Sequence, residues 1–162
     1  DQTRMPKKLH MDYLRSMYGQ NRLARGEFTI GGVKVDLSKV TIPLYFQASR
    51  EDHIAPMNSV YRSARAFSGA DVTLTLAGSG HIAGVVNPPS AKKYQHWTNP
   101  ALPETLADWQ AEAEQHPGSW WTDWSKWLSK FGGPMKPAPR QYGSAKYKVI
   151  EPAPGRYVKE KA

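Results

Sequence analysis

Residues 40–86, VTIPLYFQASREDHIAPMNSVYRSARAFSGADVTLTLAGSGHIAGVV, decide the fold. Within them, residues 41–48 form a run of apolar, aromatic and β-branched side chains that predicts one buried strand. Residues 57–67 carry apolar side chains at helical spacing, and residues 72–77 alternate threonine with apolar residues, which is the period of a strand. The stretch therefore predicts a strand, a crossover helix and a second strand of an α/β fold.

A polar loop follows each predicted strand. Asp52 lies in the loop after the first strand, and His81 lies in a glycine-flanked loop after the second. The strands of such a crossover run parallel, so both loops open on the same edge of the sheet, where ligands bind in open α/β sheets. An acid followed by a histidine is the closing half of the nucleophile–acid–base order of α/β-hydrolases. The alternative is that Asp52 only turns its loop and His81 is an ordinary surface residue.

Composition excludes several classes of protein. The chain has 162 residues, enough for one domain, and it contains no apolar run long enough to span a membrane. Its first residues have no apolar segment of a signal peptide. With no cysteine, it has no disulfide, no thiolate metal site and no thiol nucleophile of its own. We expect no metal site.

The net charge of +8 is concentrated at the two ends. Residues 1–26 hold six basic against two acidic residues, and residues 130–162 hold eight against two. A basic balance is typical of nucleic-acid or anionic partners, but no nucleic-acid-binding motif accompanies it, so we expect no nucleic-acid partner. From residue 131 on, Gly, Pro and Lys dominate, which predicts a basic extended tail (131–162) draped over a catalytic portion (1–130).

Outside the central stretch, other elements are expected. Residues 6–18 and 106–115 predict helices, and residues 27–37 predict a hairpin around Gly31-Gly32. Residues 119–128 predict a tryptophan-rich helix that carries Trp120, Trp121, Trp124 and Trp127. Its tryptophans either pack on the sheet or a dimer partner, or they form a surface for an apolar polymer.

The chain contains too few strands for a complete hydrolase sheet. At most four strands are expected, two of them in the hairpin, and no Gly-x-Ser-x-Gly elbow is present. We therefore expect a C-terminal fragment whose nucleophile lies upstream.

Several strings, spread in order over the whole chain, resemble those of class I polyhydroxyalkanoate synthases. They are residues 49–54 (SREDHI), 77–85 (AGSGHIAGV), 87–89 (NPP), 96–99 (HWTN), 118–121 (GSWW) and the ending from Tyr142 to Val158. Because several of these strings are not general features of α/β-hydrolases, the resemblance is specific. The resemblance implies that the chain corresponds to roughly the C-terminal quarter to third of such a synthase.

The resemblance implies an acyltransferase that polymerises (R)-3-hydroxyacyl-CoA, typically 3-hydroxybutyryl-CoA, into polyester and releases CoA. It implies an α/β-hydrolase-like fold with a Cys-Asp-His triad, in which Asp52 is the acid and His81 the base. Asp52 would either orient His81 or help to activate the incoming 3-hydroxyl group. Because the family cysteine has no counterpart here, the isolated chain is expected to be inactive.

Three further residues are weaker substrate-binding candidates. His53 would line a substrate channel or serve as a hydrogen-bond partner in its loop. Lys92 and Lys93 would meet the CoA phosphates, or be solvated lysines. The resemblance implies no cofactor, because CoA is part of the substrate, and it implies a cytoplasmic homodimer at the surface of polymer granules.

Two other functions remain open on the residues alone. One is a different α/β-hydrolase, such as a thioesterase, esterase or polyester depolymerase, with a serine elbow upstream. The other is a non-catalytic module that binds polymer or granules through the tryptophans and the basic tail.

Overall fold

A computed structural model describes residues 4–160 of the chain. Its helices and helical turns are α1 (Lys7–Tyr13), the π-helical η1 (Leu14–Gly19), η2 (Leu37–Lys39), α2 (Met57–Arg65), η3 (Pro89–Ala91), α3 (Leu106–Ala111), α4 (Trp121–Ser129) and η4 (Tyr157–Lys159). Its strands are β1 (Thr29–Ile30), β2 (Val33–Lys34), β3 (Leu44–Ser49), β4 (Val72–Ala77), β5 (Gln95–Thr98) and β6 (Glu114–Pro117). This mixture confirms the α/β class.

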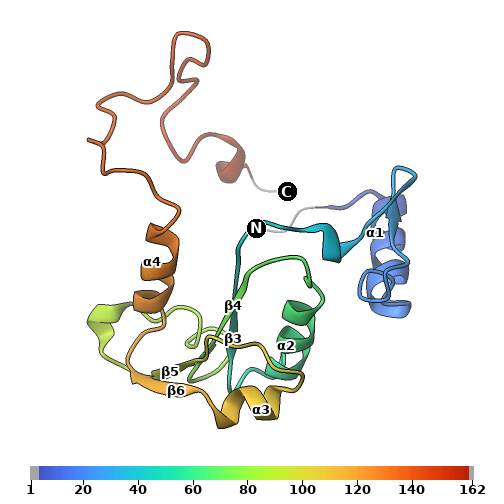
Figure 1. Cartoon of the computed structure of the whole chain (residues 1–162). Helices are drawn as coiled ribbons and strands as arrows, with labels where there is room; N and C mark the ends of the chain where they lie inside the picture. Colours follow the sequence, from blue (N-terminus) through green and yellow to red (C-terminus); the bar gives the residue numbers. More distant parts are fainter. Residues whose placement is uncertain (1–3, 161–162) are drawn as a thin grey trace.

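A four-stranded sheet in the order β3-β4-β5-β6 organises the molecule (Figure 1). β3 and β4 are parallel, and their register places Phe46 opposite Leu74 and Ala48 opposite Leu76. The two further pairs, β4 with β5 and β5 with β6, are antiparallel. The predicted strand–helix–strand unit is therefore confirmed, with β3 at one edge of the sheet.

The core lies between one face of this sheet and the helices α2 and α3. Side chains alternate between the faces of a strand, so Ala48, Leu74 and Leu76 point to the same side. They form the core together with Tyr61 and Ala64 of α2 and Leu106 and Trp109 of α3. This layer fixes β3 and β4 relative to each other, and thus the loops that follow them.

The opposite face of β3 is covered by α4. Tyr45 stacks on Trp120 with 6.2 Å between ring centroids, and its ring lies 5.3 Å from that of Trp127. The Tyr45 hydroxyl donates a hydrogen bond of 2.6 Å to Asp123 of α4. The prediction that the tryptophans pack on the sheet is therefore confirmed for Trp120 and Trp127. Trp124 is 38% exposed.

The hairpin lies apart from the main sheet, beside α1 (Figure 1). β1 and β2 pair only with each other, and Ile30 and Val33 are largely exposed. The hairpin is centred on Gly31-Gly32 as predicted, but each strand has only two residues. Its support comes from the N-terminal helix, since Phe28 lines a cavity together with Leu9 and Met17.

Two strands of the main sheet were not expected from the sequence. β5 is a four-residue strand with the sequence QHWT. The predicted 106–115 helix stops at Ala111, and β6 (EQHP) begins at Glu114, within its last two residues. Both strands are short, and β6 is polar and ends in a proline, which only an edge strand tolerates. Their pairing depends on β4 as a template rather than on local preference. The count of four strands at most was thus wrong.

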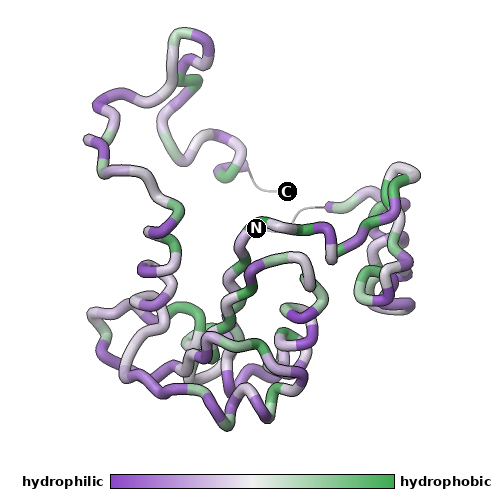
Figure 2. Tube along the Cα trace, in the orientation of Figure 1, coloured by the Kyte–Doolittle hydropathy of each residue, from purple (hydrophilic) through white to green (hydrophobic). Residues whose placement is uncertain are grey.

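Residues 131–160 form an arm that leads away from the sheet (Figure 1). Apart from η4 it has no helix or strand, and nearly all of its residues are exposed. Figure 2 shows hydrophilic and hydrophobic residues mixed along it. Residues 131–160 thus lead away from the sheet, and the division into a catalytic portion (1–130) and a basic tail (131–162) stays a prediction. Among the residues described, no helix has the length and apolarity needed to cross a membrane.

Candidate active site

Two loops leave neighbouring ends of the parallel strands: the acid loop (residues 50–56) after β3 and the histidine loop (residues 78–88) after β4. Backbone pairing continues beyond the strands and joins them. The amide of Arg50 donates to the carbonyl of Ala77 at 2.8 Å, and that of Glu51 to the carbonyl of Ser79 at 3.0 Å. These two hydrogen bonds join the first residues of the two loops. They therefore bring Asp52 and His81 close together.

Asp52 is held on both of its carboxylate oxygens. Oδ1 accepts hydrogen bonds from the backbone amides of Ile54 at 2.8 Å and Ala55 at 2.9 Å, and Oδ2 lies 2.8 Å from Nδ1 of His81. Its side chain is only 5% exposed. The Ala55 amide, followed by His81 and the Ile54 amide, lowers the pKa of Asp52 below its usual value, against the opposing effect of burial. Asp52 is therefore a carboxylate at neutral pH.

The contact with Asp52 determines which nitrogen of His81 carries the proton. An ionised carboxylate only accepts hydrogen bonds, so Nδ1 must be the donor. In the neutral imidazole, Nε2 then has a free lone pair. The His81 side chain is 44% exposed, and none of the residues in 4–160 forms a hydrogen bond with Nε2. Nε2 is thus available to take a proton from a group outside this part of the chain.

The histidine loop is compact and packs closely against the end of β3. The amide of Gly84 donates to the carbonyl of Gly80, and that of Val86 to the carbonyl of Ile82, both at 2.8 Å. Gly84 lies so close to Ser49, the last residue of β3, that a Cβ atom would overlap the Ser49 Oγ. Ser79 has a φ of +78°, a conformation that favours glycine. The turn into His81 is therefore strained, and the turn after it has no room for a side chain at Gly84.

The weaker candidates are not drawn into this pair. His53 is exposed beside Asp52, and no hydrogen bond or ion pair is formed by its side chain within the described chain. Lys92 and Lys93 are exposed between η3 and β5. The carbonyl of Lys93 accepts a hydrogen bond of 3.0 Å from the Asn87 side chain. A role of these three residues in substrate binding stays a prediction.

The structure adds groups that sequence reasoning missed. The amides of Ile54 and Ala55 cap Asp52, an arrangement that an aspartate ahead of a proline-closed turn could have suggested. The indoles of Trp120 and Trp121 reach carbonyls of the histidine loop, and no local pattern could have indicated this because 36 residues separate the partners.

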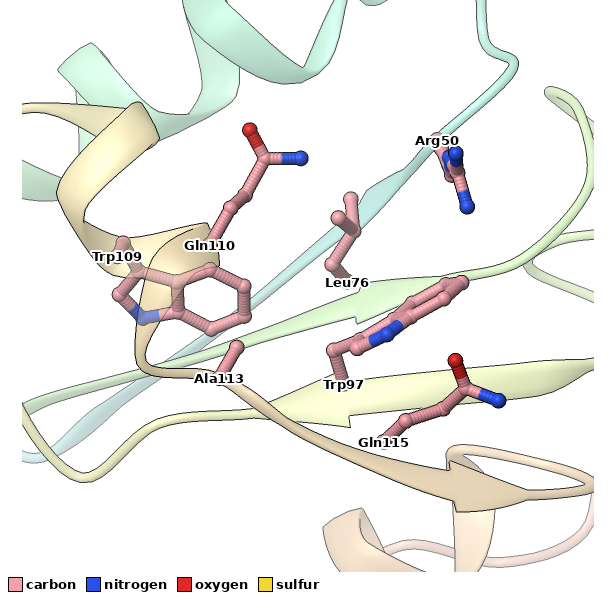
Figure 3. A pocket seen from close by; sticks show the side chains of 7 residues that line it. All are labelled: Arg50, Leu76, Trp97, Trp109, Gln110, Ala113 and Gln115. Carbon is pink, nitrogen blue, oxygen red and sulfur yellow. The ribbon is translucent and has the colours of Figure 1, made fainter.

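A cavity of about 230 Å³ lies over β4, β5 and β6 beside α3 (Figure 3). It is lined by Arg50, Leu76, Trp97, Trp109, Gln110, Ala113 and Gln115. The Arg50 guanidinium lies 5.3 Å from the centre of the Trp97 ring, a cation–π contact. Neither Asp52 nor His81 lines this cavity. Within residues 4–160, no group of three or more acidic or histidine side chains is arranged to hold a metal ion.

Comparison with known proteins shows which family the chain belongs to. No family model matches the chain. It is 49% identical over 163 aligned positions to the poly(3-hydroxyalkanoate) polymerase subunit PhaC of Cupriavidus necator, covering all of this chain. It is 45% identical over 162 positions to the subunit of the same name from Rhizobium meliloti, again covering the whole chain. Poly(3-hydroxyalkanoate) polymerase 1 of Ectopseudomonas oleovorans is 36% identical over 99% of the chain.

The similarity covers only part of each relative. The chain spans 28% of the length of the Cupriavidus necator protein, 26% of the Rhizobium meliloti protein and 29% of the Ectopseudomonas oleovorans protein. It nevertheless runs over essentially the whole of the present chain, including both loops of the site. The chain therefore belongs to the poly(3-hydroxyalkanoate) polymerase family.

Proposed function

We propose that this chain supplies the acid and the base of a poly(3-hydroxyalkanoate) polymerase, an acyltransferase that joins (R)-3-hydroxyacyl units from CoA thioesters and releases CoA. One observation carries the proposal. Asp52 holds Nδ1 of His81 at 2.8 Å and leaves Nε2 open, in a chain 44–49% identical to four relatives named as such polymerases or their subunits. The nucleophile, a cysteine, comes from a segment outside these 162 residues.

The first half of the reaction loads an acyl group on that cysteine. Nε2 of His81 takes the thiol proton, and the resulting thiolate attacks the thioester carbonyl of the substrate. The carbon–sulfur bond to CoA breaks, and the imidazolium returns the proton to the departing CoA thiolate. The Asp52 carboxylate stabilises the imidazolium between these two proton transfers.

The second half extends the chain by the same proton relay. The 3-hydroxyl oxygen of one acyl group attacks the thioester carbonyl of another, while His81 accepts the hydroxyl proton. An ester bond forms, the thioester bond breaks, and the proton passes to the released sulfur. Each cycle thus restores neutral His81 and consumes no other reactant, so we propose no cofactor besides the CoA of the substrate.

Asp52 acts in this scheme by orienting His81. Both of its oxygens are already engaged, Oδ1 by two backbone amides and Oδ2 by the imidazole, and its side chain is almost fully covered. Because the side chain is only 5% exposed, a 3-hydroxyl group would reach Asp52 less readily than the exposed Nε2 edge of His81. The geometry therefore favours the orienting role over direct activation of the hydroxyl.

The proposal also covers the domains, the oligomeric state and the location of the complete enzyme. Residues 1–130 form the last part of an α/β-hydrolase-like catalytic domain, and residues 131–162 form a basic tail. The complete enzyme acts as a homodimer in the cytoplasm at the surface of polyester granules. His53 on the acid loop, and Lys92 and Lys93 between η3 and β5, would contact the entering substrate.

A chimera tests the function directly. This chain replaces the matching 28% of the Cupriavidus necator polymerase, and CoA release and polymer are measured with (R)-3-hydroxybutyryl-CoA. We expect the chimera to release CoA and form polyester, and the 162-residue chain alone to do neither. The His81→Ala chimera should fold and lose both activities.

Other results would reject the proposal. Full turnover by the His81→Ala chimera would show that the pair is not catalytic. Free 3-hydroxybutyrate in place of polyester would identify a thioesterase. CoA release by the isolated chain would show that it contains a nucleophile of its own.

A further inference from the structure

We propose that Trp120 and Trp121 are positioning residues that hold His81 against Asp52 by fixing the backbone of the histidine loop. The inference rests on the proposed function of the Asp52–His81 pair. It assigns a specific task to two tryptophans whose spacing suggested only packing or polymer binding.

Two consecutive indoles bind two consecutive carbonyls. Nε1 of Trp120 donates a hydrogen bond to the carbonyl of Gly84, and Nε1 of Trp121 donates one to the carbonyl of Val85, both at 2.9 Å. Two adjacent anchors fix both the position and the direction of the loop backbone, which a single hydrogen bond would not do. Gly84 lies only three residues after His81, so this anchoring acts close to the imidazole.

The anchored loop has few other supports beyond its own turn. Its internal hydrogen bonds, such as that from Gly84 to Gly80, define the turn but do not attach it to the sheet. The start of the loop is attached by backbone hydrogen bonds from Glu51 to Ser79 and from Gly78 to Gln95. For residues 82–86, attachment comes from the tight approach of Gly84 to Ser49 and from the two indoles. Gly84 is buried, so its carbonyl would lose a hydrogen bond that water could not readily replace if Trp120 were absent.

The tryptophans are themselves fixed to β3, the strand that carries the acid loop. Trp120 is 9% exposed and stacks on Tyr45, whose hydroxyl donates to Asp123 one turn further along α4. Burial, together with the Asp123 hydrogen bond, raises the pKa of Tyr45, so its hydroxyl remains a donor at neutral pH. The Ser119 Oγ accepts a hydrogen bond of 3.1 Å from the Trp121 amide.

A continuous series of contacts therefore connects Asp52 with His81. β3 leads directly into the acid loop, and through Tyr45 it also holds α4, whose first residues hold the histidine loop. A shift of α4 relative to β3 would move His81 without moving Asp52. Proton transfer depends steeply on such geometry, since misplacements of about 1 Å can cost about 100-fold in rate.

The test uses the active chimera with the double substitution Trp120→Phe/Trp121→Phe, which keeps an aromatic ring and removes both N–H donors. The control is Trp124→Phe on the same helix, since Trp124 is 38% exposed and its indole does not donate to the histidine loop within the described chain. Steady-state CoA release gives kcat and KM. Hydrogen exchange followed by mass spectrometry measures protection of residues 82–88.

We expect the Trp120/Trp121 variant to lose about tenfold in kcat with KM unchanged within about twofold, and the loop amides to exchange about tenfold faster. The control should keep kcat and loop protection within about twofold. A loss of kcat alone, with unchanged KM and unchanged melting temperature, separates positioning from general destabilisation. Trp121→Phe alone, at a half-buried site, provides a milder variant and should lower kcat about threefold.

Normal kcat and normal loop protection in the Trp120/Trp121 variant would overturn the inference, as would an equal loss in the control. Failure of the proposed function has a different signature. In that case the His81→Ala chimera keeps its turnover, whatever the tryptophan substitutions do to loop exchange.

Discussion

The acid loop and the histidine loop leave adjacent strands, yet they are stabilised in different ways. The acid loop is held by its own side chain, because Asp52 accepts the amides of Ile54 and Ala55 within the same turn. The histidine loop is held by distant residues, through the contact with Ser49 and the indoles of α4. The acid is thus fixed locally, whereas the base depends on the tertiary structure.

The strongest test of this comparison replaces Asp52 in two ways. Asp52→Asn keeps an oxygen acceptor for the two loop amides but removes the charge that faces His81, so we expect kcat of the chimera to fall by about 10³–10⁴-fold, with a melting temperature that falls less than in Asp52→Ala. Asp52→Ala should lose as much activity and also lower the melting temperature, because the amides lose their acceptor. Equal melting temperatures for the two variants would contradict local stabilisation of the acid loop.

Gly84→Ala tests the histidine loop alone. The added methyl group would overlap the Ser49 side chain and the carbonyl of Gly80, so we expect a loss of about 1–3 kcal/mol in unfolding free energy, measured by denaturant titration. Gly80→Ala is a matched control in the same loop, since its Cβ would meet only the Glu51 carbonyl at 3.7 Å. Similar losses for both glycines would show that the close contact with β3 is unimportant.

The pH dependence of stability distinguishes the loops further. The pKa of Asp52 is lowered in the folded chain, chiefly by the Ala55 amide, so its contribution is complete above the ordinary aspartate pKa. The contribution is lost as the pH falls through the depressed folded value. The difference in unfolding free energy between the wild type and Asp52→Asn should therefore be constant near neutrality and shrink below about pH 4. A difference that shrinks between pH 6 and 8 would instead implicate a histidine.

Ser79→Gly is the smallest change. Because Ser79 has a φ of +78°, glycine should relieve backbone strain and stabilise the chain by about 1 kcal/mol in thermal or chemical unfolding. A destabilised variant would show that the serine side chain contributes more than its backbone conformation costs.

The same division between local and distant support explains what the sequence could predict. β4 and α2 were recognisable because their residues alternate or recur with a clear period, and the ends of β3 and β4 placed Asp52 and His81 together. β5 and β6 were missed, since strands of four polar and aromatic residues have no period to detect. The indole anchors were missed because they join residues 36 positions apart. What the chain encodes locally was predictable, and what only its packing creates was not.

The edge position of β3 has a consequence for handling the chain in solution. In the described residues β3 hydrogen-bonds only to β4, which leaves alternate backbone N–H and C=O groups of its other side without a strand partner. The six residues Leu44–Ser49 carry no charge that would hinder pairing with a strand of another molecule. Pro43, just before the strand, lacks an amide hydrogen and cannot donate to such a strand. At high concentration the isolated chain should therefore self-associate through this strand, and capping by a strand from another segment should keep it monodisperse.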